Sequence, residues 1–275
     1  MTSPNESKHS QTGGTDRNST DSRLARVPGV LDDLEREVVE EQFGVAEEQV
    51  RRDHAISHTL AAISAVSTEE IIFFGGTALS RTHLPDLRLS EDIDLIALAD
   101  RSDVADQIER AVTRQLRRSL GAVYFSPRLR ETKHPDPAVM DVGSSRVQVQ
   151  LLSSIGYPEW PTEIIDIHQR YSDAPSARLR VLTPPAFAAA KLAAWSARAS
   201  PRDLYDLWAL AEHGMVDNEA VALFSRFGQY TRASAVDFSR VPPDEQWQVE
   251  LGHQCVPQVM PDEAVAVVRD SWNRL

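Results

Sequence analysis

Two aspartates one residue apart, Asp92 and Asp94, have the residue type and spacing of a cation site. Side chains of a β-strand alternate between its faces, so both carboxylates would point the same way while Ile93 and Leu95 enter the core. Mg²⁺ is a hard cation that prefers carboxylate oxygens and usually keeps room for water and phosphate oxygens. The pair therefore predicts a magnesium site suited to in-line phosphoryl transfer.

A glycine pair, Gly75 and Gly76, precedes the aspartates and follows an apolar segment. Without Cβ atoms these residues let the backbone approach phosphates closely, and residues 77–83 can present a helix N-terminus to an anion. Thr77 adds a hydroxyl group. Either motif by itself is more often an ordinary turn or strand end. Together they predict a site, because unpaired carboxylates at the start of the apolar run 93–98 are costly without a metal or a partner.

The order of these motifs resembles a known family. Residues 75–79 read Gly-Gly-Thr-Ala-Leu and residues 88–95 read Arg-Leu-Ser-Glu-Asp-Ile-Asp-Leu, similar to the first motif of the AbiEii/AbiGii (MenT-type) nucleotidyltransferase toxins, within the DNA polymerase β-like superfamily. Residues 182–194 and the Pro-Arg-Asp-Leu-Tyr-Asp-Leu stretch at 201–207 are similar to later motifs of the family. The resemblance implies an α+β fold with a polymerase β-like nucleotidyltransferase domain.

The resemblance also implies roles by position. Asp92 and Asp94 would ligate the metal and form the catalytic group together with Lys191 and Asp203. The expected nucleotide-binding residues are Gly75, Gly76, Thr77, Arg88, Ser90 and Lys191. From the residues alone, Lys191 lies in a run of strong helix formers, where it could reach a phosphate or stay solvated.

Two further residues, Asp206 and Arg88, have alternative interpretations. Asp206 could complete the site, or it could brace Arg202 or its own helix. Arg88 could bind phosphate, or it could pair with Asp86 or Glu91.

One departure from the family concerns a third carboxylate, which polymerase β-like enzymes commonly place on a later strand. Residues 146–152 alternate like a strand, with Gln148 and Gln150 on one face. Neutral glutamine is a poorer metal ligand than carboxylate, so we expect weaker metal affinity. Asp141 could compensate from the preceding turn, or Asp203 could take the third place; loss of activity is the alternative.

Other reactive side chains form weaker patterns. His83 and His134 could each deprotonate a hydroxyl group, but neither belongs to a recognisable dyad, and we assign them no role. No histidine-based metal spacing is identified. Ser90 fits a turn cap better than a nucleophile. Cys255 is the only cysteine, which excludes an internal disulfide and a cysteine-rich zinc site.

Charge is unevenly distributed. The net charge of −12 argues against non-specific attachment to nucleic acid. Arg110, Arg114, Arg117 and Arg118 nevertheless fall three or four residues apart and would share one face of a helix. This face could bind RNA, although a solvated helix face is the more ordinary interpretation.

Periodicity predicts the elements that position these residues. Residues 30–66 suggest two helices broken around Phe43 and Gly44. Strands are expected at 71–74, 93–97, 122–125 and 146–152, with the arginine-bearing helix between the second and third. Further helices are expected at 186–199, 201–213, 218–227 and 261–275. The result is a small mixed sheet flanked by helices, followed by a helical C-terminal domain.

With 275 residues and 41% hydrophobic content, the chain can form one large or two modest domains. Residues 1–22 are polar and predict a disordered tail. We expect a nucleotidyltransferase domain over 23–157 and a mainly helical domain over 158–275, with Lys191 and Asp203 facing the metal strand across a cleft. Lacking an apolar run of about 20 residues and a signal peptide, the protein is expected to be cytoplasmic, without a membrane partner.

The leading hypothesis is a Mg²⁺-dependent nucleotidyltransferase that joins the NMP part of an NTP to an RNA hydroxyl and releases pyrophosphate. By resemblance, the acceptor would be the tRNA 3′ end, and the protein would be the toxin of a type IV-like toxin–antitoxin (abortive infection) system with a cognate antitoxin. Two alternatives stay open. One is a catalytically weak nucleotide- or partner-binding module, suggested by Gln150 and the acidic balance, and the other is a nucleotidyltransferase for a small hydroxylated acceptor.

Overall fold

The computed structural model describes residues 27–66 and 68–275, and the tail predicted for residues 1–22 lies outside them. The described strands form one mixed sheet of seven strands in the order β3-β4-β5-β2-β1-β7-β6. Their bounds are β1 (Ile71–Phe74), β2 (Asp92–Ala97), β3 (Val123–Ser126), β4 (Ala138–Val142), β5 (Ser145–Ser153), β6 (Thr162–Asp166) and β7 (Arg178–Leu182).

Strand β2 lies in the middle of this sheet and carries the two aspartates. It pairs antiparallel with β1 and parallel with β5. Ile93 and Leu95 are fully buried, whereas Asp92 and Asp94 are half-buried on the opposite face. The predicted alternation is confirmed, and the sheet fixes both carboxylates on one side.

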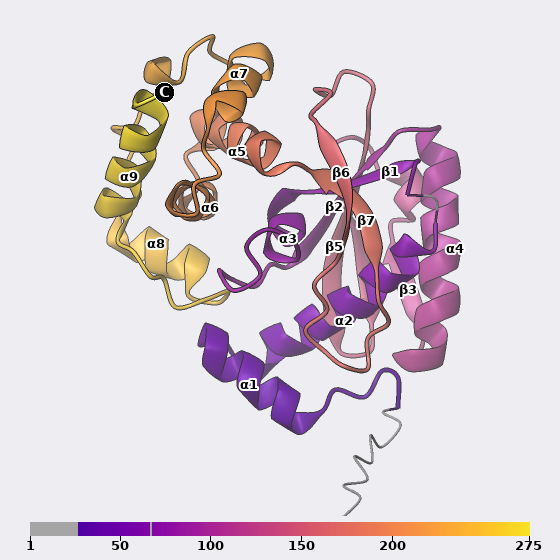
Figure 1. Ribbon diagram of the computed structural model, residues 1–275. Helices are drawn as coiled ribbons and strands as arrows, with labels where there is room; N and C mark the ends of the chain where they lie inside the picture. The colour runs from indigo at the N-terminus through magenta and orange to yellow at the C-terminus, as the bar shows by residue number, and fades with distance from the viewer. Residues whose placement is uncertain (1–26, 67) are drawn as a thin grey trace, which may run out of the picture.

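Helices cover the sheet on two sides (Figure 1). Helices α2 (Glu47–Ser64) and α4 (Arg101–Ser119) pack against each other and against β5, while α3 (Gly75–Ser80) packs against β1 and β2 on the other side. Helix α1 (Asp33–Phe43) starts where the Asp32 carboxylate accepts a hydrogen bond from the Leu34 amide at 2.9 Å. It ends at Gly44, whose φ of 66° is the left-handed conformation that favours glycine.

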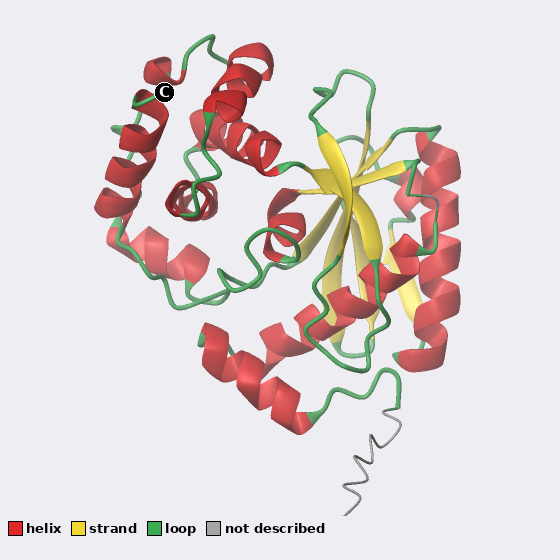
Figure 2. Ribbon diagram, viewed as in Figure 1, coloured by secondary structure: helices red, strands yellow, loops and turns green. Residues whose placement is uncertain are grey.

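The last third of the described chain is helical and lies beside α3, as Figure 2 shows. Its helices are α5 (Pro184–Arg198), α6 (Pro201–Glu212), α7 (Asn218–Phe227), α8 (Asp244–Leu251) and α9 (Pro261–Asn273). Trp195, Trp247 and Trp272 are almost fully buried between them. Within the described residues, none of the helices combines the length and apolar character that crossing a membrane requires.

The sheet is larger than the four strands expected from the sequence. Strand β4 was not predicted, and β6 and β7 follow the proposed division after residue 157. Strand β7 pairs parallel with β1, and β6 pairs antiparallel with β7. The sheet therefore continues to Leu182. Prolines at 158, 161 and 175 interrupt this segment and obscure its strands in the sequence, although residues 178–182 alternate between arginine and apolar side chains.

Candidate active site

The candidate active site is a cavity of about 260 Å³ between the sheet and α5. Asp94, Gly75, Gly76, Lys191 and Asp203 are among its lining residues, so the structure brings together five of the residues predicted from the sequence. Asp92 lines a second hollow of about 310 Å³.

The turn before α3 holds glycine at close range to the carboxylates. Gly75 has a φ of 79°, and a Cβ atom placed on it would lie 2.2 Å from Asp94 Oδ2. A Cβ atom on Gly76 would lie 2.7 Å from Arg88 Nη2 and 3.1 Å from Ser90 Oγ. Only glycine therefore fits at position 75, where both the conformation and the space exclude a side chain. The buried Thr77 hydroxyl donates a hydrogen bond to the main-chain oxygen of Asp92, which ties α3 to β2.

The aspartates on β2 lack counterions. Among the described residues neither Asp92 nor Asp94 has a hydrogen-bond or ion-pair partner for its carboxylate. Burial, followed by the charge of Asp92, raises the pKa of Asp94 to about 6. Burial, followed by the charge of Glu91, also raises the pKa of Asp92. Two half-buried, unpaired carboxylates on one strand have the donor set that a hard divalent cation prefers.

The facing side of the cavity holds cations on α5 and acids on α6. Lys191 Nζ lies 2.6 Å from Asp206 Oδ2 and 3.2 Å from Asp203 Oδ1. Arg198 Nε lies 2.6 Å from Asp203 Oδ2, and its Nη2 lies 2.9 Å from Asp203 Oδ1. Asp203 and Asp206 are three residues apart, so both face α5 and hold its two cations.

Arg88 belongs to the same network. Its Nε and Nη2 each donate to a carboxylate oxygen of Asp206 at 2.8 Å, and its Nη1 donates to Gln254 Oε1 at 2.7 Å. The alternative partners Asp86 and Glu91 are therefore wrong for Arg88. Asp206 likewise binds Arg88 rather than Arg202, because the Arg88 side chain is buried and approaches it from the segment before β2.

In this network the neighbouring cations change the pKa values of the aspartates more than burial does. Burial alone would raise the pKa of Asp206, but Arg88 and Lys191 lower it to about 2. Burial acts the same way on Asp203, and Lys191 and Arg198 together lower its pKa. Both carboxylates are therefore ionised at neutral pH.

The place of the expected third carboxylate is occupied by Gln150, which lies opposite Asp94 in the β2–β5 register and lines the cavity. Its side-chain amide donates a hydrogen bond to the main-chain oxygen of Pro135. Asp141 does not compensate: its carboxylate accepts a hydrogen bond from Arg146 Nε at 2.8 Å, four residues along β5 from Gln150.

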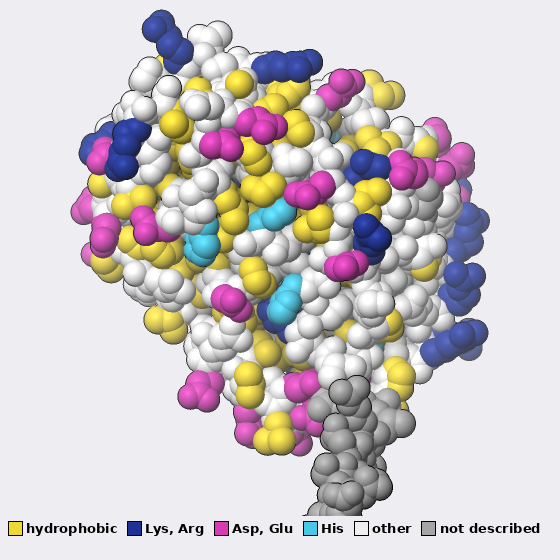
Figure 3. Space-filling model, in the orientation of Figure 1, with side chains coloured by type: hydrophobic (Ala, Val, Ile, Leu, Met, Phe, Trp, Pro, Cys, Tyr) yellow, Lys and Arg dark blue, Asp and Glu magenta, His cyan; other side chains and the backbone are white. Residues whose placement is uncertain are grey.

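The predicted RNA-binding arginines all lie exposed on α4. Figure 3 shows dark-blue side chains along the edge of the molecule formed by this helix. Because α4 covers the opposite side of the sheet from α3, the structure does not bring Arg110, Arg114, Arg117 and Arg118 to the cavity.

Arg198 is a lining residue that the sequence analysis missed. It follows Lys191 by seven residues, which is two turns of an α-helix, so both side chains lie on the same face of α5. This spacing is the signal that could have identified it.

A mixed sheet that holds paired carboxylates beside a glycine turn, opposite a lysine from a helical region, defines a nucleotidyltransferase. A sequence model of the family described as "Nucleotidyl transferase AbiEii toxin, Type IV TA system" matches residues 58–267. The match covers more than half of the chain, so the chain belongs to this family of nucleotidyltransferase toxins of type IV toxin–antitoxin systems. The resemblance seen in the motifs is confirmed.

Solved structures agree on the fold. The chain is similar to MenT4, a nucleotidyltransferase toxin from Mycobacterium tuberculosis H37Rv, with a TM-score of 0.62 and 20% identity over 86% of this chain and 88% of that chain. It is also similar to a protein from H. pylori described as a nucleotidyltransferase, with a TM-score of 0.52 and 12% identity over 84% and 95%. No curated protein matches the sequence. The predicted fold class is confirmed.

Proposed function

We propose that this chain is a Mg²⁺-dependent enzyme that transfers an NMP group from an NTP to the 3′ end of tRNA and thereby arrests growth. The observation that carries the proposal is the pair Asp92 and Asp94, whose carboxylates have no partner among the described residues. Asp94 lies beside Gly75 and across a cavity from Lys191. Membership of a family of nucleotidyltransferase toxins supports it.

The triphosphate is assigned to the cavity. The backbone at Gly75 and Gly76 can approach phosphate oxygens because no Cβ atom stands in the way. Lys191 and Arg198 supply positive charge from the facing helix. Arg88 and Ser90 lie beside Gly76, where Arg88 fixes the turn through Asp206 instead of lying free for the nucleotide.

The donor atoms near β2 fit Mg²⁺. Asp92 and Asp94 offer four carboxylate oxygens without competing partners among the described residues, and Gln150 offers a neutral amide oxygen next to them. When bound, Mg²⁺ would supply Lewis-acid chemistry that lowers the pKa of the attacking hydroxyl and neutralises the triphosphate. Asp92 and Asp94 hold that charge at the edge of the cavity.

The reaction breaks a phosphoanhydride bond of the NTP and forms a phosphodiester bond to the acceptor. The acceptor hydroxyl oxygen forms a bond to the α-phosphorus, the bond from that phosphorus to the bridging oxygen breaks, and pyrophosphate leaves with its electrons. Gln150 has no titratable group and cannot accept the hydroxyl proton. That proton is therefore transferred to Asp92, Asp94 or water. Lys191 and Arg198 stabilise the negative charge on the departing pyrophosphate.

The arginine face of α4 is assigned to the body of the RNA. A tRNA extends well away from its 3′ end, so a basic surface remote from the cavity can contact the same molecule through its phosphates. Since NTPs and tRNA are cytoplasmic, we place the activity there. The toxin family supports an antitoxin as the partner that restrains it.

Incubation of the full chain with Mg²⁺, total RNA and each α-labelled NTP tests the proposal. We expect label in the tRNA fraction, removable by trimming the 3′ end, and no label with Asp94→Ala. Asp166→Ala is the matched control, because Asp166 also lies on a strand and its side chain is 91% exposed. Nucleotide binding without transfer would instead support a binding module, and transfer confined to small hydroxylated molecules would support the third hypothesis.

Expression in cells tests the toxin assignment. Wild-type protein should arrest growth, Asp94→Ala should not, and co-expression of the neighbouring reading frame should restore growth. Arrest by both forms would contradict the link between transfer and toxicity.

A further inference from the structure

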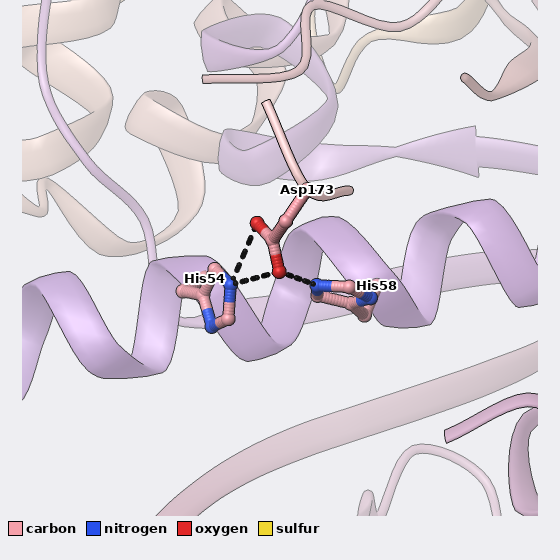
Figure 4. Close-up of side chains that lie close together, drawn as sticks. All are labelled: His54, His58 and Asp173. Carbon is pink, nitrogen blue, oxygen red and sulfur yellow. Dashed lines mark hydrogen bonds and ion pairs between the residues drawn. The ribbon is translucent and has the colours of Figure 1, made fainter. Parts of the chain in front are cut away.

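A second group of chemically active side chains lies away from the cavity (Figure 4). His54 and His58 are four residues apart on α2, so both rings leave the same face of the helix. Asp173, from the loop between β6 and β7, points its carboxylate between them. The prediction that the histidines show no metal-ligand spacing is therefore wrong for His54 and His58.

The three side chains converge closely. His54 Nε2 lies 3.0 Å from both oxygens of Asp173, and His58 Nε2 lies 3.0 Å from Oδ2. The main-chain amide of Gly29 also donates to Oδ2 at 2.8 Å. The carboxylate has about four lone-pair sites, so it can accept a hydrogen bond from each ring and from the amide. Both imidazoles therefore direct the same ring nitrogen at one carboxylate, and these are also the donor atoms that a metal ion would use.

Burial strengthens this point. The side chains of His54, His58 and Asp173 are 5%, 1% and 1% exposed. With neutral imidazoles the group would bury a net negative charge, which a divalent cation would neutralise. Within the described part of the chain it is the one set of at least three histidine, cysteine, aspartate and glutamate ligands close enough to share a metal ion.

We propose that His54, His58 and Asp173 form a binding site for a divalent transition metal ion of the zinc class. Two imidazoles and a carboxylate are ligands that Zn²⁺ prefers. Bonds of about 2.0–2.2 Å in a tetrahedral site separate ligand atoms by roughly 3.3–3.6 Å. The ligand atoms here all lie within 4.8 Å of one another, so no separation has to shorten by more than about 1.5 Å.

The surroundings fit a site of this kind. The Gly29 amide would hold the ligating carboxylate in place, as outer hydrogen bonds do at metal centres. A water molecule from the adjoining hollow of about 360 Å³, which is lined by His58 together with Pro28 and Pro175, would be the fourth ligand. The metal would link α2 to the segment before α1 and to the β6–β7 loop, which are distant in sequence.

Metal binding by the untagged full chain tests the proposal. After treatment with a chelator, we expect the protein to take up about one Zn²⁺ per chain and Co²⁺ to give the intense visible absorption of a tetrahedral site. Zn²⁺ should also raise the Tm by about 5 °C or more. His58→Gln and Asp173→Asn should each weaken Zn²⁺ binding by more than about 100-fold.

Two controls separate this site from others. His213→Gln changes an exposed histidine outside the group and should bind Zn²⁺ like the wild type. Asp94→Asn should keep the tetrahedral Co²⁺ spectrum, so failure of the proposed transferase would leave this result unchanged. If the wild type binds no Zn²⁺ at micromolar concentrations, gives only a weak octahedral Co²⁺ spectrum, or binds equally well with Asp173→Asn, the site does not exist.

Discussion

The site contains two pairs of aspartates in opposite electrostatic settings. Asp92 and Asp94 on β2 have no partners among the described residues, and their pKa values are raised. Asp203 and Asp206 on α6 are more deeply buried, at 0% and 1% exposure, yet cations lower their pKa values. Burial alone therefore does not determine the charge state of a carboxylate in this molecule; the cations arriving from other elements do.

The two pairs of aspartates therefore have different effects on the stability of the folded chain. The α6 pair fixes Lys191, Arg198 and Arg88 in place and so stabilises the folded chain. The β2 pair destabilises the folded chain when both carboxylates are ionised, because burial raises their pKa values. Four variants test this difference between the two pairs.

The largest effect is expected from Asp206→Asn. This change leaves the buried Arg88 without its ionised partner, and the free energy of unfolding should fall by about 3–5 kcal/mol. The pKa of Asp206 is lowered to about 2, so its stabilising effect is complete above about pH 4 and is lost as the pH falls towards 2. Urea unfolding at several pH values measures both effects. Asp270→Asn removes an exposed ion pair instead and should change stability by no more than about 0.5 kcal/mol.

Lys191→Gln tests a residue that belongs to both settings. Lys191 contacts Asp203 and Asp206, and it lines the cavity that Asp94 also lines. Asp203 keeps Arg198 and Asp206 keeps Arg88, so folding should be affected less than by Asp206→Asn. Transfer should slow by about 10²-fold, or about 2.7 kcal/mol, because charge stabilisation of the leaving group is lost. Single-turnover kinetics give the value, with exposed Lys133→Gln as the control. Equal rates for both variants would assign Lys191 to packing alone.

Asp94→Asn should stabilise the protein while inactivating it. Since the folded pKa of Asp94 is raised to about 6, the folded state binds this proton more tightly than the unfolded state, and wild-type stability falls as pH rises from about 4 to 6. Without divalent cations, the variant should gain about 1–3 kcal/mol at pH 7.5 and almost nothing at pH 4. Adding Mg²⁺ should stabilise only the wild type.

The pH series measures that gain directly. A variant less stable than the wild type at pH 7.5, with Asp166→Asn unchanged, would show that Asp94 has partners that stabilise its charge.

The smallest effect is expected from Gln150→Glu, which adds a carboxylate beside the unpaired acids. Mg²⁺ affinity should rise by about 10-fold, or about 1.4 kcal/mol, because carboxylate is the better ligand. Gln248→Glu is the control, because Gln248 lies exposed on α8 and outside both hollows that Asp92 and Asp94 line. Titration calorimetry compares them. An unchanged affinity for Gln150→Glu would place the cation away from β5.

The parts of the site that depend on local rules could be predicted from the sequence. Alternation along a strand placed Asp92 and Asp94 on one face, and the absence of Cβ atoms identified the turn at Gly75 and Gly76. The break between α1 and α2 likewise follows from Gly44, whose left-handed conformation ends the first helix.

The partners could not be predicted, because they depend on packing between distant segments. Arg88 and Asp206 are separated by 118 positions, and the sequence offered nearer acids for the same arginine. His54 and His58 showed a readable spacing, but the approach of Asp173 depends on the loop after β6. The wider sheet was missed for a similar reason: β7 is defined by its pairing with β1, across more than a hundred residues.

The pairing of β1 with β7 continues the sheet past residue 157. Helix α5 starts two residues after β7 ends, so the distance from Gly75 to Lys191 is set by one strand ladder instead of a flexible hinge. A fragment ending at residue 157 would leave one edge of β1 unpaired, which favours aggregation, and would lack Lys191 and Arg198 from the wall of the cavity.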